Sequence, residues 1–418
     1  MISLLSRFLH KFLFFFSFLL LIPFALIVFT PLKNKIKFLK IRRDVIGNSV
    51  EQLYLYLNIY KKNKFHYFFF DDDYICNNYF NKICKKNLKF SFFGKTIFYL
   101  SKKINLFNHL MLPMPSWQTI NKYRFNINNL KIPNEFKFSS EENKIGNNFL
   151  NNIGVLKNQK LICLLVRDNF YKKKYSNDKK RNWNYDRYRD ADINTYFKSV
   201  KYLNKKKYFV IRMGKGAKKS SKYKNKFYFD YANSNKRDDF LDFWITSRCF
   251  FFITTGTGLD EICQIYKRPV LDTNYLPYCE LRSFRTNNLT IFKKIKYIKS
   301  KKILTLSDSI KNTLFAKPNL LINKYKKQFI WQNNSDHEIL DAVIEMQKLL
   351  ILKNKNKAKK NLFFQKKFWK IYKSFFKYDY LYAKNVNNYI KTCYEYRYLY
   401  NKINIPKNFL INNKWLQN

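Results

Sequence analysis

A glycine turn in the sequence has the composition of an anion-binding loop. The segment Thr254-Thr255-Gly256-Thr257-Gly258 follows the apolar run 250–253 and precedes residues 259–266, which have helical spacing. In such a turn the backbone N–H groups at the N-terminus of the following helix point away from the helix. An anion bound there is stabilised by these N–H groups and by the positive end of the helix dipole. The chain contains 8 glycines, and two lie here. We expect Thr255, Gly256, Thr257, Gly258 and Asp260 to hold a diphosphate; a simple tight connection is the alternative.

Arginines follow two of the apolar runs. Arg167 and Asp168 come directly after one run, and Arg212 and Gly214 close the next. The carboxyl ends of parallel strands meet at one edge of a sheet, where open α/β folds bind ligands. A guanidinium group donates paired hydrogen bonds to phosphate oxygens. We therefore expect both arginines to contact the diphosphate, unless each is paired with a nearby aspartate.

Acidic residues before a helical stretch offer a candidate base. The segment from Tyr185 to Asp192 is dense in both signs of charge. One of Asp190 and Asp192 fits the N-cap of the following helix. The remaining carboxylate is suited to accept a proton from an acceptor hydroxyl. We name Asp190, Asp192 and Asp168 as candidate catalytic residues, with capping and pairing to arginine as the alternative roles.

Two more residues complete the predicted donor-binding set. Arg237 opens a helical stretch with acidic residues in its first turn, a pattern that capping alone also explains. Asn274 begins a loop, Asn274-Tyr275-Leu276-Pro277, of a size to cover a base or ribose. Asp71-Asp72-Asp73 has no second carboxylate cluster to complete a metal site, which favours a solvated turn.

Metal and nucleophile chemistry have little support in the sequence. All four histidines lie outside the motif region, so no Ser-His-Asp or Cys-His arrangement is visible. The seven cysteines include no CxxC pair, which disfavours a zinc site or a disulfide framework. We expect no metal, no cofactor, and cysteines that are buried in a reducing compartment.

The order of the apolar runs predicts the fold. Strand-like runs at 161–166, 208–213, 227–229, 249–253 and 270–271 alternate with helical stretches. This alternation is typical of a parallel sheet with helices on both faces. We predict an α/β chain with two Rossmann-like domains and four parts: a membrane anchor at 1–35, an acceptor-side domain at 36–155, a donor-binding domain at 156–335 and a helical C-terminal extension at 336–418.

The N-terminus predicts a transmembrane helix. Residues 12–30 form an apolar run interrupted only by Ser17 and Pro23, long enough to cross hydrocarbon. Lysine and arginine are concentrated after the run, so the positive-inside rule places the remaining chain on the cytoplasmic face of the bacterial inner membrane. A cleaved signal peptide and a helix lying in the interface are the alternatives.

The charge is extreme but diffuse. The chain carries 81 Lys+Arg against 28 Asp+Glu, a formal net charge of +53. A clustered charge of this size indicates nucleic-acid binding. Here lysine is spread along the chain and is inflated together with Asn, Ile, Phe and Tyr, as in AT-rich genomes. We expect a cationic surface near anionic inner-membrane lipid, and no nucleic-acid partner.

Several short motifs occur in one order between residues 160 and 300. They are VRD at 166–168, YRDADI at 188–193, VIRMG at 210–214, DYA at 230–232, RxDFxD at 237–242, TTGTGLD at 254–260 and RPVLxxNYLP at 268–277. In this order the chain resembles an uncharacterised bacterial family of predicted glycosyltransferases linked to surface-polysaccharide synthesis. The resemblance implies a GT-B-like fold and sugar transfer. Asn48 departs from the family, which more often has histidine after the glycine there.

The expected function is transfer of a sugar from a nucleotide-sugar donor to a lipid-linked or polysaccharide acceptor, without a metal. The arginines and turn amides would stabilise the leaving diphosphate. A nucleotide-sugar epimerase of the same build is one alternative, which would turn over the donor with no acceptor present. A membrane-surface polyanion- or nucleic-acid-binding protein is another, whose affinity would fall steeply with salt.

Overall fold

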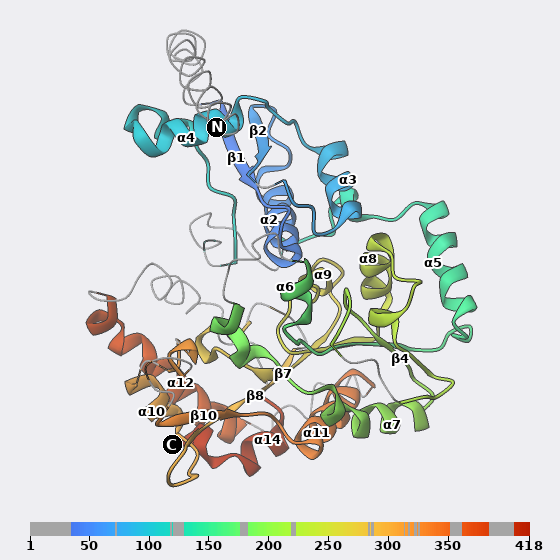
Figure 1. Cartoon of the computed structure of the whole chain (residues 1–418), viewed down its shortest axis with the longest axis vertical. Coiled ribbons are helices and arrows are strands. Elements are labelled where there is room, and N and C mark those ends of the chain that lie inside the picture. Colours follow the sequence, from blue (N-terminus) through green and yellow to red (C-terminus); the bar gives the residue numbers. More distant parts are fainter. Residues whose placement is uncertain are drawn as a thin grey trace, which may run out of the picture. The chain divides into compact units, whose positions relative to one another are not determined.

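The computed structural model divides the chain into two compact units, Met1–Ser116 and Trp117–Asn418 (Figure 1). It describes residues 35–71, 73–117, 119, 129–175, 183–218, 223–282, 285, 288–312, 314–316, 318–321, 324, 327–351, 362–383 and 405–418. The division falls before residue 155, where the sequence analysis set its domain boundary. It assigns helix α5 (Ser140–Asn152) to the second unit, because α5 packs on α8 (Asp239–Arg248) there.

The first unit is a small parallel α/β arrangement. Strands β1 (Lys37–Ile41) and β2 (His66–Phe70) pair in parallel, and isolated bridges add Met111 beside β1 and Phe90 beside β2. Helices α2 (Ile46–Tyr60), α3 (Asn78–Asn87), α4 (Gly94–Lys103) and the 3-10 helix η1 (Asn105–Leu110) follow in chain order. In the described residues this parallel sheet is much smaller than that of a full Rossmann-like domain.

The second unit is built on a six-stranded sheet in the order β5-β4-β3-β6-β7-β8, all parallel. Its strands are β3 (Leu161–Leu165), β4 (Phe209–Arg212), β5 (Tyr228–Phe229), β6 (Phe251–Thr254), β7 (Val270–Tyr275) and β8 (Leu289–Phe292). This order is that of the doubly wound Rossmann fold, and its direction reverses between β3 and β6. The predicted parallel α/β sheet is confirmed.

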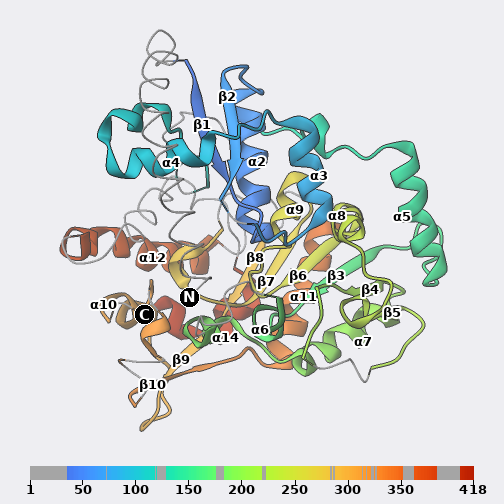
Figure 2. The ribbon, with the colours of Figure 1, turned by 45° about the horizontal axis from the view of Figure 1, so that its top comes forward.

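Helices cover both faces of this sheet. Figure 2 shows α8 and α9 (Glu261–Ile265) on one side, and α7 (Phe197–Lys205) and α11 (Asp336–Ile351) on the other. The strands are buried on both faces because both are covered, which explains their continuous apolar sequences. Shorter helices in the connections are α6 (Phe170–Tyr175), η4 (Asn134–Phe136), η5 (Trp183–Arg189), η6 (Ile193–Tyr196), η7 (Tyr231–Asn233) and η8 (Tyr278–Glu280).

The C-terminal part packs back on the sheet unit. Its elements are the antiparallel pair β9 (Lys294–Tyr297) and β10 (Phe329–Gln332), then α10 (Leu306–Lys311), η9 (Pro318–Leu321), α12 (Leu362–Ala383), α14 (Lys407–Asn412) and η12 (Lys414–Gln417). The Tyr372 hydroxyl donates to the Tyr278 carbonyl oxygen at 2.7 Å. Phe368 and Leu416 are buried in the same core as the sheet residue Ile162, so these helices belong to the sheet's own core.

The predicted transmembrane helix is not supported and is corrected here. Across the part of the chain that the structure describes, every helix is too short or too polar to cross a membrane. Residues 12–30, on which that prediction rested, lie outside the described residues. The fold class is therefore α/β with a parallel sheet, and the membrane-spanning element is removed from it.

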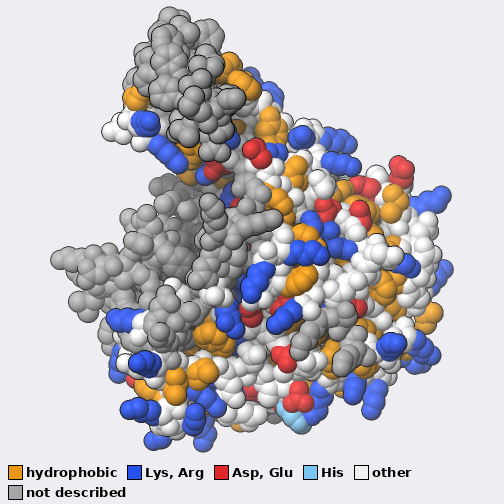
Figure 3. All heavy atoms as spheres, in the orientation of Figure 1, with side chains coloured by type: hydrophobic (Ala, Val, Ile, Leu, Met, Phe, Trp, Pro, Cys, Tyr) orange, Lys and Arg blue, Asp and Glu red, His pale blue; other side chains and the backbone are white. Residues whose placement is uncertain are grey.

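The surface charge is spread rather than gathered. On the described part of the face in Figure 3, lysine and arginine side chains are distributed over several elements and acidic side chains are sparse. This agrees with the distribution of lysine along the sequence. A diffuse charge raises the general attraction to polyanions without defining a binding site.

Candidate functional site

The loops after β3 and β6 meet at the switch point of the sheet. The Arg167 backbone N–H donates to the Thr255 hydroxyl oxygen at 3.0 Å. Thr255 is buried, and the Arg167 side chain is 12% exposed. Open α/β sheets bind ligands at this edge, where neighbouring connections leave the sheet in opposite directions. The structure thus brings two predicted site residues together at the expected place.

Asp190 and Lys293 lie beside Arg167. Arg167 Nε is 3.4 Å from Asp190 Oδ1, and the Ala191 N–H donates to the Arg167 carbonyl oxygen at 3.0 Å. The Lys293 ammonium donates to the Asp190 carbonyl oxygen. Lys293 directly follows β8 and is fully buried. Two cations therefore contact Asp190 at the carboxyl edge of the sheet, Arg167 at the carboxylate and Lys293 at the backbone carbonyl oxygen.

Burial sets the ionisation of Lys293. Removal from water lowers the pKa of its ammonium, the Asp190 charge raises it, and the Arg167 charge lowers it further, to about 7. An ammonium with this pKa gives up its proton near neutral pH. Lys293 is therefore a group whose charge responds to the arrival of an anion.

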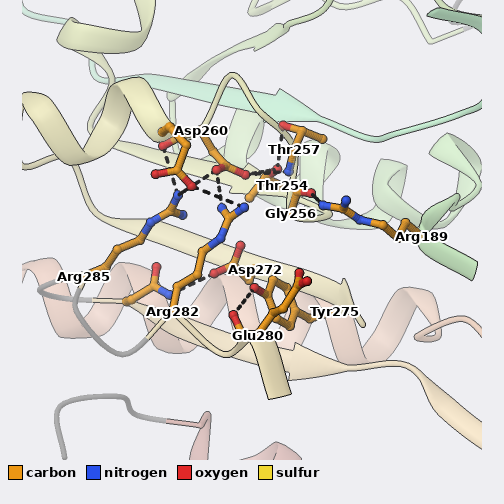
Figure 4. Close-up of polar contacts among 12 residues, drawn as sticks. Arg189, Thr254, Gly256, Thr257, Asp260, Asp272, Tyr275, Glu280, Arg282 and Arg285 are labelled. Carbon is orange, nitrogen blue, oxygen red and sulfur yellow. Dashed lines mark hydrogen bonds and ion pairs between the residues drawn. The ribbon is translucent and has the colours of Figure 1, made fainter. Parts of the chain in front are cut away.

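Gly256 forms the tight part of the turn after β6. Its φ is +71°, a left-handed conformation that side chains rarely adopt. The Arg189 guanidinium donates to the Gly256 carbonyl oxygen, and the Tyr275 ring packs against the glycine (Figure 4). Arg189 thus adds a third cation from the YRDADI segment to this edge.

Replacing Gly256 with alanine should destabilise the protein more than the same change at Gly154. Both glycines have positive φ, +71° and +86°. A Cβ at Gly256 would lie 3.0 Å from Tyr275 Cε2, whereas nothing lies within 4 Å of one at Gly154. We expect Gly154→Ala to lower the free energy of unfolding by about 1 kcal/mol, the left-handed cost alone, and Gly256→Ala by about 2 kcal/mol or more. Urea unfolding measures both; equal losses would contradict this packing at Gly256.

Asp260 accepts hydrogen bonds from two residues of the glycine turn and so fixes its shape. Its Oδ2 accepts from the Thr254 hydroxyl at 2.9 Å and from the Thr257 N–H at 2.8 Å. Its Oδ1 accepts from Arg282 and, at 2.7 Å, from Arg285 (Figure 4). Burial would raise the pKa of this carboxyl group, but the two guanidinium charges lower it to about 2.

This arrangement changes the predicted role of the turn. The Thr257 N–H, expected to face a diphosphate, donates to Asp260. The expected helix at 259–266 is the five-residue α9, so its dipole is small. The carboxylate of Asp260 accepts the hydrogen bond of the turn that was predicted for a bound anion.

Glu280 is a carboxylate near these cations that the sequence analysis did not identify. It lies on η8, is partly exposed, and its backbone oxygen accepts from the Tyr275 hydroxyl at 2.6 Å. Burial raises the pKa of its carboxyl group, and the charges of Arg189 and Arg282 oppose that rise. Figure 4 shows it beside Tyr275, near Gly256 and Arg189.

Several other predicted residues are held in pairs within the protein. Arg212 is buried and its Nη1 lies 3.1 Å from Asp230 Oδ2. Arg237 contacts Asp239 Oδ1 at 2.6 Å and also contacts Asp242. These pairs are the alternative role considered for the arginines. Gly214 turns the chain after β4 with φ +137°, and the Gly258 carbonyl oxygen accepts from the Glu261 N–H at 3.3 Å.

The remaining predicted residues support loops and caps. The Asp168 carboxylate accepts from the Phe170 and Lys218 N–H groups at 3.0 and 2.9 Å. Asp192 is exposed and caps η6 by accepting from the Asn194 N–H. Asn274 is buried at the end of β7, where it donates to the Tyr196 hydroxyl oxygen at 2.9 Å and accepts from the Asn334 N–H at 2.7 Å. These contacts place the three residues in structural roles.

Lys293, Glu280, Arg282 and Arg285 were missed because they follow a region with weak sequence signals. The strand β8 before Lys293 is short and contains Thr290. The two arginines lie beyond the last recognised motif. Lys293 directly follows an apolar run, just as Arg167 does, and this position is the sequence feature that could have identified it.

A surface cavity lies at the opposite edge of the sheet. Its volume is about 420 Å³, and its lining includes Lys160, Phe250 and Arg268, which precede β3, β6 and β7, together with Asn143 of α5. The amino ends of the strands face this cavity, and none of the predicted site residues lines it. The predicted site residues therefore lie away from this cavity. In the described residues no group of three or more His, Cys, Asp or Glu side chains is placed to hold a metal ion.

Comparisons with known proteins give a weak structural similarity. No protein-family model matches the sequence, and no curated protein matches it. The chain is similar to the crystal structure of the glycosyl transferase family 9 from Veillonella parvula DSM 2008, with a TM-score of 0.44 and 10% sequence identity over 77% of this chain and 98% of that chain. At this level the similarity carries no argument about the site.

Proposed function

We propose that the second unit binds a nucleotide-sugar and transfers its sugar to a glycan or lipid-linked acceptor. One observation carries the proposal: Arg167 and Lys293 flank Asp190 at the carboxyl edge of a Rossmann-ordered sheet, next to the left-handed Gly256. A nucleoside diphosphate is the ligand whose charge and size suit two cations beside a switch point. The resemblance of the motifs to predicted glycosyltransferases supports the same chemistry.

The cations would act on the leaving group. Transfer of a sugar leaves negative charge on the diphosphate, and fixed positive groups in a buried site stabilise that charge as it develops. Arg167 is oriented by Asp190, and Lys293 is fixed by the Asp190 carbonyl oxygen. Asp190 is then a positioning residue, because its carboxylate contacts Arg167 and its carbonyl oxygen accepts from Lys293. In this proposal the side chains supply the positive charge.

Glu280 fits the task of proton acceptor, because burial raises the pKa of its carboxyl group. Replacing Glu280 with glutamine should lower kcat about 100-fold with little change in KM for the donor. Asp190→Asn should instead raise the donor KM, because it releases Arg167. Steady-state kinetics with saturating acceptor separates the two, and a Glu280→Gln enzyme within twofold of the parent rate would move the base elsewhere.

Donor binding should weaken as pH rises through about 7, because Lys293 then loses its proton. The charged groups beside this ammonium are Asp190 and Arg167. Lys293→Arg should remove this dependence, since a guanidinium stays protonated. Donor dissociation constants measured from about pH 6 to about pH 9 provide the check. A parent enzyme with the same affinity across that range would show that Lys293 does not face the donor.

A screen of donors tests the proposed function itself. UDP- and GDP-sugars, with CMP-sugars as donors that lack a diphosphate, are incubated with the full chain in the presence or absence of lipid extracts as acceptors. Nucleotide release is followed by chromatography. The proposal predicts nucleotide release from one donor class, increased by acceptor and reduced in Arg167→Ala. Change of the sugar without nucleotide release would favour the epimerase, and no turnover of any donor would contradict both.

A further inference from the structure

Two adjacent phenylalanines of the first unit are turned out into solvent. Phe92 is 92% exposed and Phe93 is 42% exposed, just before α4. Among the large hydrophobic side chains of the described residues, Phe92 has the highest exposed fraction. Apolar side chains that gather on a surface and are rimmed by polar groups mark interaction sites. This pair therefore requires a partner of its own.

The fold holds these rings outward. The Ser91 N–H donates to the Phe68 carbonyl oxygen of β2 at 2.9 Å, and the Ile97 N–H donates to the Phe93 carbonyl oxygen at 2.9 Å. Gly94 is packed so closely on β2 that a Cβ there would lie 2.8 Å from Phe69 Cδ1. The turn is thus anchored on both sides, and its outward rings are a built feature of the unit.

The helix that follows the two rings carries exposed lysines. Lys95, Lys102 and Lys103 are exposed on α4, and Lys102 Nζ lies 4.2 Å from the Phe98 ring centroid. Tyr99 on the same helix is 39% exposed. The sequence from Tyr74 to Asn134 contains no aspartate or glutamate. We call Phe92, Phe93, Tyr99, Lys95, Lys102 and Lys103 the α4 surface.

We propose that the α4 surface docks on an anionic lipid bilayer. Aromatic rings partition into the headgroup region, and each nearby lysine adds attraction to acidic lipid. Such a surface lies on the membrane and does not span it. The two Phe rings are T-shaped at 85°, with centroids 5.9 Å apart.

The test uses the full chain and measures both vesicle binding and the protection of the α4 surface itself. Protein is mixed with phosphatidylcholine vesicles, with or without phosphatidylglycerol, and both sedimentation and amide hydrogen exchange across residues 89–99 are measured. We expect binding to vesicles with phosphatidylglycerol, weakened by salt, with slowed exchange in this segment. Phe92→Ser/Phe93→Ser should lose that protection and bind at least about tenfold more weakly. Lys102→Gln/Lys103→Gln should weaken binding by about fivefold per lysine.

The control is Leu156→Ser in the second unit, where a large apolar side chain is 63% exposed; it should keep both readouts. Unchanged exchange over 89–99 on any vesicle, or equal protection in the Phe92→Ser/Phe93→Ser variant, would overturn the proposal. So would a single-stranded oligonucleotide that protects this segment when vesicles do not. No donor is present, so the outcome is independent of the proposed sugar transfer.

Discussion

An Arg167→Ala/Lys293→Met variant should lose sugar transfer by at least about 1000-fold in kcat/KM while keeping its fold. Each cation would stabilise the leaving diphosphate, and removal of one such group from a preorganised site typically costs 10²- to 10³-fold. Their loss leaves Asp190 as a negative charge facing the donor. Initial rates with the donor class found in the screen measure the effect.

Matched substitutions control for general loss of charge. Arg248→Ala and Lys299→Met remove exposed cations that are not part of the site. Arg248 contacts Asn143 of α5, near the amino edge of the sheet. Both control variants should retain transfer within about twofold. If they reduce transfer as much as the site variant does, the effect comes from net charge, and the assignment of Arg167 and Lys293 fails.

An Asp260→Asn variant should lower the free energy of unfolding by about 3–5 kcal/mol, because it leaves Arg282 and Arg285 buried without their shared carboxylate. Arg285 is buried, and its Nη2 also contacts Glu261 Oε1 at 3.0 Å, which holds part of the charge. Guanidinium chloride unfolding of both proteins gives the difference. A loss under about 1 kcal/mol would show that the network is solvated rather than buried.

The Asp260 carboxylate should also make the free energy of unfolding depend on pH. Its pKa is about 2 when folded and ~4 when unfolded, so its stabilisation is complete above about pH 4 and is lost as pH falls towards 2. The parent should lose about 2–3 kcal/mol over that range from this group. Asp260→Asn should lack this component of the acid dependence. Parallel acid dependences in the two proteins would rule out a lowered pKa for Asp260.

The sheet could be predicted because its strands are buried on both faces. Continuous apolar runs such as Leu161–Leu165 and Phe251–Thr254 follow from that burial, and the intervening helices imply parallel connections. Strand β8 escaped prediction because it is short, contains Thr290 and is flanked by Asn288 and Lys293. Strand order also depends on pairings that no local pattern encodes.

The site could be predicted only in outline. The position of Arg167 followed from a strand ending at the sheet's carboxyl edge, and the structure places it there. Arg212 ends a strand in the same way, but the parallel pairing of β4 with β5 brings Asp230 to it. Both arginines therefore contact an aspartate, Asp190 for Arg167 and Asp230 for Arg212, and the sequence pattern alone names neither partner. The approach of Lys293 to Asp190, more than a hundred residues away in sequence, is a tertiary contact.

Calorimetric titration of UDP, GDP and CDP into the parent protein and the Arg167→Ala/Lys293→Met variant shows whether these two cations bind a nucleoside diphosphate. We expect one nucleoside diphosphate to bind the parent and the variant to lose this binding, while Arg248→Ala retains it. Absence of binding by all three, or equal binding by parent and variant, would contradict a diphosphate site at the carboxyl edge of the sheet.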